Sequence, residues 1–191
     1  MPLSAPAPIP TERLTVRQLA SADLPALLEV NGDNAVTRFL PYATWQSLTD
    51  ADAWFARMEA MQATGTGIQF VVVEKSTQKS VGTCLLFRYD EGSSRAEIGY
   101  VLGRAYWGSG YMEEALRGLI QYAFSTIGLR RLEAEVNPEN VASTGLLQRV
   151  GFQKEGLLRQ RWVGKGEPYD VAVFGLLKDE YLQLQAAASG V

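Results

Sequence analysis

The spacing of hydrophobic residues predicts one short strand and two helices in the first third of the chain. Residues 14–16 alternate between apolar and polar, as in a strand. A helix is expected from about residue 23 to 31 with Ser21 as its cap, and a second helix follows the capping-box pattern of residues 49–52. The segment 34–45 between them carries polar residues and a proline, so we expect irregular chain there.

From about residue 68 the hydrophobic pattern becomes that of strands. Two β-rich runs, 70–74 and 81–89, flank a short polar turn and predict a hairpin, and 96–102 forms a third strand. The elements that follow are a helix from Met112 to Ile127, a strand over 131–136, a helix over 141–150, a hairpin over 152–177 and a short helix after Lys178. This order of elements predicts an α/β domain with a mixed sheet.

The chain is expected to form one domain, because 191 residues suffice for a sizeable core and no repeat or internal linker interrupts the pattern. The predicted domain covers residues 12–185, between flexible tails over 1–11 and 186–191. The N-terminus has neither the basic-then-apolar pattern of a signal peptide nor the length of a membrane span. We therefore expect a cytoplasmic protein without a membrane partner.

Composition and charge exclude several functional classes. The net charge of −3 leaves no basic face for a nucleic acid. The chain has no histidine, which removes the Ser-His-Asp triad and most zinc sites, and we expect no metal. The single cysteine, Cys84, cannot form an internal disulfide, which favours a reducing compartment. It lies in the apolar run 81–87, where a buried, inert thiol is expected.

A glycine-rich loop between a strand and a helix is the predicted centre of the chemistry. Gly108 and Gly110 have no side chains, so a diphosphate can approach the main chain there, at the positive end of the helix that follows. Two glycines alone are equally compatible with a simple turn. We assign the phosphate cradle to the backbone of Trp107, Gly108, Ser109, Gly110, Tyr111 and Met112.

Two nucleotide-binding motifs are disfavoured for this loop. It lacks the Gly-Lys-Ser/Thr ending of a mononucleotide P-loop. A dinucleotide fingerprint would have its third glycine where Glu113 stands, and its first glycine would follow the strand directly.

A family resemblance covers most of the chain, from about residue 13 to 181. The run Glu97-Ile98-Gly99-Tyr100 with Tyr106-Trp107-Gly108-Ser109-Gly110-Tyr111-Met112-Glu113-Glu114 resembles the central motif of the GNAT acetyltransferases. The run from Leu132 to Ser143, followed by Gly151-Phe152, resembles the next motif. Both are similar to the RimJ/RimL-type subgroup, the N-terminal acetyltransferases of ribosomal proteins. One departure is Ala105, where the family motif prefers Gln or Arg.

The resemblance implies the GNAT fold and its donor site. That fold is an α/β (α+β) domain whose central mixed, mostly antiparallel sheet has one splayed parallel strand pair and helices on both faces. Acetyl-CoA is the implied co-substrate, with its pantetheine along the strand and its thioester oxygen near the N–H of Tyr100 or Val101. Asn137 and Asn140 are implied pantetheine contacts, although turn and cap chemistry explains them too, and capping is favoured for Asn140.

The resemblance also suggests an acid and a base for direct transfer without an acyl-enzyme. Glu97 stands where some relatives have a catalytic carboxylate, although it also suits a solvated strand, and Glu135 is a second candidate. Ser143 matches the serine thought to meet the departing CoA thiolate, although it also suits the first turn of a helix. Tyr169 and Asp170 are expected to border the acceptor groove, opposite the segment 34–45, although Asp170 equally suits a structural turn.

The acceptor is expected to be a primary amine, most simply the α-amine of a protein or peptide N-terminus. Three alternatives stay open: acetylation of a small amine such as a polyamine or aminoglycoside, a non-catalytic CoA-binding sensor, and a plain nucleotide-binding module. The acyl group, acetyl or succinyl, and the oligomeric state, monomer or homodimer, are not decided by the residues.

Overall fold

The computed structural model describes residue 3 and residues 7–188 and has an eight-stranded sheet at its centre. The strand order is β1-β2-β3-β4-β5-β6-β8-β7, and every neighbouring pair is antiparallel except β5 and β6. The strands are β1 (Ile9–Pro10), β2 (Leu14–Gln18), β3 (Ile68–Glu74), β4 (Ser80–Asp90), β5 (Arg95–Leu102), β6 (Arg131–Val136), β7 (Gln153–Gly164) and β8 (Glu167–Leu177).

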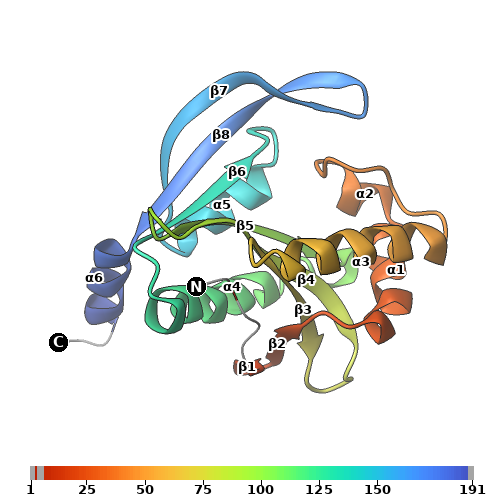
Figure 1. The fold of residues 1–191 in the computed structure, drawn as a ribbon, viewed down its shortest axis with the longest axis horizontal. Helices are drawn as coiled ribbons and strands as arrows, with labels where there is room; N and C mark the ends of the chain where they lie inside the picture. Colours follow the sequence, from red (N-terminus) through yellow and green to blue (C-terminus); the bar gives the residue numbers. More distant parts are fainter. Residues whose placement is uncertain (1–2, 4–6, 189–191) are drawn as a thin grey trace.

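Helices cover both faces of the sheet (Figure 1). Phe70 and Val72 of β3 face a core built mainly with α4 and α5, while Val71 and Val73 face a second core built with α1 and α3, as alternation along a strand requires. The helices are η1 (Ser21–Asp23), α1 (Leu24–Asn31), α2 (Asn34–Thr37), α3 (Leu48–Ala63), η2 (Arg104–Tyr106), α4 (Tyr111–Tyr122), the π-helical turn η3 (Ala123–Ile127), α5 (Val141–Arg149) and α6 (Lys178–Ala188).

The predicted fold class is confirmed, including the splayed parallel pair. β5 and β6 pair over three residues only, from Arg95–Arg131 to Glu97–Glu133. Beyond that point β5 stays paired with β4 and β6 stays paired with β8, so the sheet opens between β5 and β6.

The buried, unreactive state expected of Cys84 is also confirmed, since burial raises the pKa of its thiol to about 12.

Three local predictions differ from the structure. The capping box of α3 is formed by Ser47 and Asp50, two residues before the predicted one, and the Asp50 carboxylate accepts the Ser47 N–H at 3.1 Å. The segment predicted to be irregular contains the one-turn helix α2, capped by Asp33. Ile9 and Pro10, placed in a flexible tail from the sequence, form β1 against β2.

The end of the chain is also more regular than expected. Residues 186–188, which the sequence places in a C-terminal tail, continue α6, and residues 189–191 lie outside the described residues. Among the described residues, no helix combines the length and apolar composition needed to cross a membrane.

Candidate active site

The candidate site lies where β5 and β6 separate. β5 continues for five residues after its last pair with β6, and its edge on that side has no strand beside it. Gly103 donates its N–H to Val81 of β4 at 2.8 Å, and alternate residues of a strand direct their backbone groups to the same side. The N–H of Val101 therefore faces β4, and that of Tyr100 faces the gap. Of the two N–H groups predicted from the sequence, only that of Tyr100 is positioned for a ligand between the strands.

The glycine loop follows β5 after Gly103 and the short helix η2, and it leads into α4. Gly108 and Gly110 have φ values of +71° and +80°, a left-handed conformation that favours glycine. Within the described part of the chain, the backbone N–H groups of residues 108–113 have no hydrogen-bond acceptor. Six consecutive donors at the positive end of a helix form an anion-binding arrangement that needs no lysine.

Side chains of the loop hold its shape and leave the main chain accessible. The Trp107 indole N–H donates to the carbonyl of Leu102 at 2.8 Å, and the Ser109 hydroxyl donates to the carbonyl of Tyr106 at 2.5 Å. Tyr111 stacks on Tyr106 with 5.8 Å between ring centroids, so both tyrosines pack the start of α4. Of the six residues of the predicted cradle, Gly108 to Met112 offer free backbone donors in the described structure, and Glu113 continues the run. Trp107 does not, because its N–H donates to the carbonyl of Arg104 at 3.2 Å.

Two carboxylates in the first turn of α4 would repel a diphosphate, but both are paired with arginines. Arg13, the residue before β2, binds Glu114 at 2.6 Å and also donates to the carbonyl of Ser109 at 2.9 Å. Arg117 and Arg149 bind Glu113 at 2.8 and 3.1 Å. These ion pairs offset the negative charge beside the cradle, and Arg13 ties the loop to the sheet.

Glu97 is buried on the side of the sheet that carries Glu133 and Glu135, with 6% of its surface exposed. Burial raises the pKa of its carboxyl to about 6, while Arg88 opposes that rise through an ion pair of 2.6 Å. A buried carboxylate with a pKa near neutrality suits proton transfer better than a solvated one. The solvated-strand alternative for Glu97 is therefore wrong.

The second carboxylate candidate, Glu135, has a different environment. Its carboxylate accepts the indole N–H of Trp162 at 2.6 Å and lies 3.6 Å from Arg88. Glu133 is held by Arg95 at 2.7 Å and by Arg131 at 2.8 Å. Neither Arg88 nor Trp162 was singled out from the sequence, because the backbone geometry that brings them here leaves no pattern in the residue types.

Ser143 lies in the first turn of α5, on the other face of the sheet from Glu97. Its hydroxyl is 2.6 Å from the hydroxyl of Tyr100, and either group can be the donor. Burial raises the pKa of Tyr100 to about 12, so this phenol keeps its proton at neutral pH. The pair spans from β5 to α5 and combines two residues that were predicted separately.

The two asparagines serve the turn between β6 and α5. The Asn140 side chain accepts the N–H of Ser143 at 3.2 Å, which confirms its capping role. The Asn137 side-chain oxygen accepts the N–H of Glu139 at 2.9 Å. The oxygens of both amides are therefore used within the protein, and their side-chain nitrogens remain as donors for a ligand.

The acceptor side is bounded by the β7–β8 hairpin, which extends past the sheet toward α2 (Figure 1). At its tip, Lys165 donates to the carbonyl of Thr37 at 2.8 Å. The segment 34–45 thus faces the hairpin, as predicted. Its Trp45, however, is buried 5.3 Å from the Trp54 ring and belongs to the core instead of the groove. Asp170 is a structural residue that accepts the N–H of Gln160.

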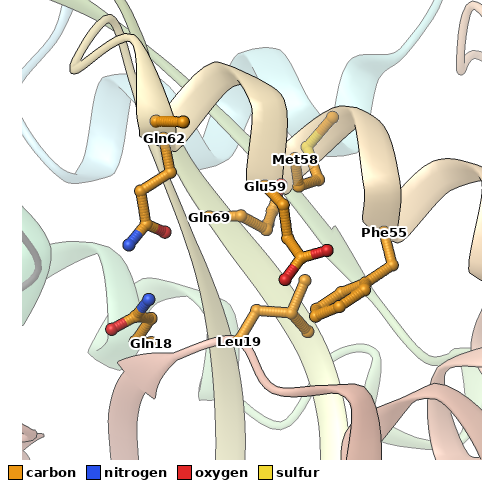
Figure 2. A pocket seen from close by; sticks show the side chains of 8 residues that line it. Gln18, Leu19, Phe55, Met58, Glu59, Gln62 and Gln69 are labelled. Carbon is orange, nitrogen blue, oxygen red and sulfur yellow. The ribbon is translucent and has the colours of Figure 1, made fainter.

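A cavity of about 320 Å³ lies elsewhere, between α3 and the strands β2 and β3 (Figure 2). The described residues that line it include no arginine or lysine, and Glu59 is its one carboxylate. It adjoins the C-terminal half of α3, the negative end of the helix dipole, where a diphosphate is disfavoured. The donor site is therefore assigned to the β5–β6 gap and not to this cavity.

Comparison with known proteins agrees with this geometry. The family described as "Acetyltransferase (GNAT) domain" matches residues 13–153. The chain is 39% identical over 171 residues to the "Uncharacterized N-acetyltransferase p20" of Bacillus licheniformis, covering 90% of this chain and 96% of that protein. It is 27% identical to the "[Ribosomal protein uS5]-alanine N-acetyltransferase" of Escherichia coli, over 90% and 91% of the two chains.

Among solved structures, RimJ of Mycobacterium smegmatis in complex with CoA-disulfide superposes with a TM-score of 0.83, at 22% identity and over 98% and 95% of the two chains. The chain belongs to the GNAT acetyltransferases. It is an N-acetyltransferase with RimJ/RimL-type relatives.

Proposed function

We propose that this protein transfers an acetyl group from acetyl-CoA to the N-terminal α-amine of a protein or peptide. The observation that carries the proposal is the opening between β5 and β6. The buried carboxylate of Glu97 lies at the last residue that pairs with β6, and the free N–H groups of residues 108–113 follow the unpaired end of β5 along the chain. A donor and an acceptor entering from opposite faces would meet there, and direct transfer requires such a meeting.

The donor half of the site fits CoA by its chemistry. The backbone N–H groups from Gly108 to Glu113 bind the diphosphate, and the Asn137 amide nitrogen donates to pantetheine. The N–H of Tyr100 donates to the thioester oxygen and stabilises the negative charge that develops on it during attack. GNAT acetyltransferases use acetyl-CoA, and these residues match that co-substrate.

Glu97 is the general base. It accepts a proton from the acceptor nitrogen, which forms a C–N bond to the acetyl carbonyl carbon as the C–S bond of the thioester breaks. A peptide α-amine has a pKa of about 8, so roughly a tenth of it is neutral and nucleophilic at pH 7. Attack on the carbonyl makes this nitrogen more acidic, and a carboxylate with a pKa of about 6 can accept the proton that it then releases. In one concerted step the Ser143 hydroxyl protonates the departing thiolate and takes a proton from the Tyr100 hydroxyl. Water then returns a proton to Tyr100, and Glu97 releases to water the proton that it accepted from the amine.

This assignment predicts that Ser143→Ala and Tyr100→Phe each lower kcat about tenfold with little change in KM for acetyl-CoA, because a CoA thiolate is a fair leaving group that needs modest help. The double variant should lose no more than the single ones, since both hydroxyls belong to one relay. Steady-state thiol-release kinetics measure this. Thr144→Val is the matched control on the same helix turn, because the one bond of the Thr144 hydroxyl within the described residues goes to the carbonyl of Val141. Unchanged kcat in both single variants would refute the relay.

A peptide acceptor is favoured by β7, the edge strand that brings Trp162 to Arg88 beside Glu97. Trp162, which binds Glu135, belongs to β7, and this edge strand leaves Leu157, Leu158 and Val163 exposed by 48%, 40% and 70%. An extended peptide can lie along such an edge, whereas a small amine needs no surface of this length. The relative from Escherichia coli that is named for alanine acetylation of a ribosomal protein supports the same acceptor class.

The acceptor class is tested by thiol release with acetyl-CoA and a panel of amines. Peptides beginning with Ala or Ser are expected to give a kcat/KM at least tenfold above spermidine and an aminoglycoside. A preference for the small amines would overturn the acceptor assignment. Stabilisation by acetyl-CoA without turnover of any amine would indicate a CoA sensor, and succinyl-CoA in parallel reactions tests the acyl group.

A further inference from the structure

Arg88 occupies an unusual position in β4. Along this strand Cys84 and Leu86 point into the core with α4, so a regular strand would direct Arg88 there too. Between Phe87 and Asp90 the pairing with β5 shifts by one residue, and Tyr89 packs against that core in place of Arg88. Arg88 has a φ of +50°, a left-handed conformation that costs about 1 kcal/mol for a residue with a Cβ. The bulge thus moves Arg88 to the face of Glu97.

On that face the Arg88 guanidinium is surrounded by groups that fix it. It lies 2.6 Å from the Glu97 carboxylate and 3.6 Å from that of Glu135. Its central carbon is 5.2 Å from the ring centroid of Trp162 and 5.4 Å from that of Phe87, within cation–π range. Trp162 in turn donates to Glu135. Residues from β4, β5, β6 and β7 therefore meet around one guanidinium.

We propose that Arg88 is a positioning residue that orients the Glu97 carboxylate toward the acceptor amine and keeps it in the proton-accepting form. The proposal rests on the proposed function of Glu97 as the base. Strain at Arg88 is tolerated because the bulge places its charge at this point, as is common for backbone outliers at functional sites. Nothing in the packing of β4 requires an arginine here, since its side chain is 41% exposed.

The charges around Glu97 make this role necessary. Burial disfavours the ionised form of Glu97, and so do Glu135 and Glu133 of β6, which face it. Arg95 and Arg131 offset Glu133, which leaves Arg88 as the cation paired with Glu97 in the described part of the chain. Without Arg88, Glu97 would hold its proton to a higher pH and fail as a base near neutrality.

Arg88→Asn and Arg88→Lys test the proposal. Asparagine tolerates the left-handed backbone at this position, so the change removes the charge with little strain. The Glu97 titration is followed by carboxyl ¹³C NMR of the free protein, and kcat/KM is measured against pH with acetyl-CoA and an N-terminal alanine peptide. In Arg88→Asn the midpoint of both curves should rise by about one pH unit, while Arg88→Lys, which keeps the charge, should stay close to wild type.

An unmoved midpoint in folded Arg88→Asn overturns the proposal, because a purely structural arginine would change stability and leave the titration in place. Folding of Arg88→Asn is checked by its stabilisation with acetyl-CoA. If Arg88→Asn does not fold, Arg88→Gln is used in its place. The NMR readout needs no turnover, so it separates the two hypotheses. The Glu97 midpoint could shift in Arg88→Asn while the Glu97→Gln enzyme stays fully active. That result would refute the base assignment but not the ion pair.

Discussion

Gly110→Trp is expected to abolish the stabilisation that acetyl-CoA gives the wild-type protein. At about one hundred times its Kd, a ligand that binds only the folded state adds roughly 2.7 kcal/mol to the free energy of unfolding. Trp at position 110 would add a large side chain within the run of residues that offer free N–H groups, in a backbone with φ of +80° and with its Cβ 3.4 Å from the Arg13 guanidinium. Thermal shift with acetyl-CoA, CoA, ATP and NAD measures the effect, and in the wild type only the first two ligands should stabilise.

Gly128→Trp is the matched control for this experiment. Gly128 has a φ of +81°, ends the helical segment that begins with α4, and has no neighbouring atom within 4 Å of an added Cβ in the described structure. Both variants therefore bear the same backbone strain of about 1–2 kcal/mol, but only Gly110 lies at the cradle. If acetyl-CoA stabilises Gly110→Trp as much as it stabilises Gly128→Trp, the donor site lies elsewhere.

Glu97→Gln is expected to lower kcat/KM about 100-fold at neutral pH, the usual scale for loss of a general base. In both proteins kcat/KM should fall below about pH 8, where the peptide amine becomes protonated. The wild-type profile should steepen further with a second midpoint near pH 6, because the pKa of Glu97 is raised to about 6 and only its ionised form, dominant above that pH, accepts a proton. The variant should lack this second, steeper limb. Thiol release with an N-terminal alanine peptide, measured from pH 5 to 9, gives both values.

Glu133→Gln and Glu135→Gln accompany this experiment. Glu133 pairs in register with Glu97, but its carboxylate is held by Arg95 and Arg131, so its loss should leave most of the activity. Glu135 is the competing base. Should Glu135→Gln lose activity while Glu97→Gln keeps it, the roles of the two carboxylates are reversed.

Local sequence patterns determine much of this protein. The order of strands and helices follows from residue spacing, and the glycine loop follows from residues that alone accept a left-handed backbone, as at Gly108 and Gly110. The capping box of α3 was misplaced by two residues, because Ser47–Asp50 and Thr49–Asp52 offer similar cap chemistry and only the backbone decides between them.

The surroundings of each candidate residue were decided by the tertiary structure. The sequence identifies Glu97, Tyr100 and Ser143 one by one, but the Tyr100–Ser143 pair depends on packing α5 against β5. Arg88 and Trp162 reach Glu97 and Glu135 through a bulge in β4 and an arched hairpin, and neither leaves a periodic signal. Residue order encodes local conformation directly, whereas the burial that sets the pKa of Glu97 arises only when distant strands meet.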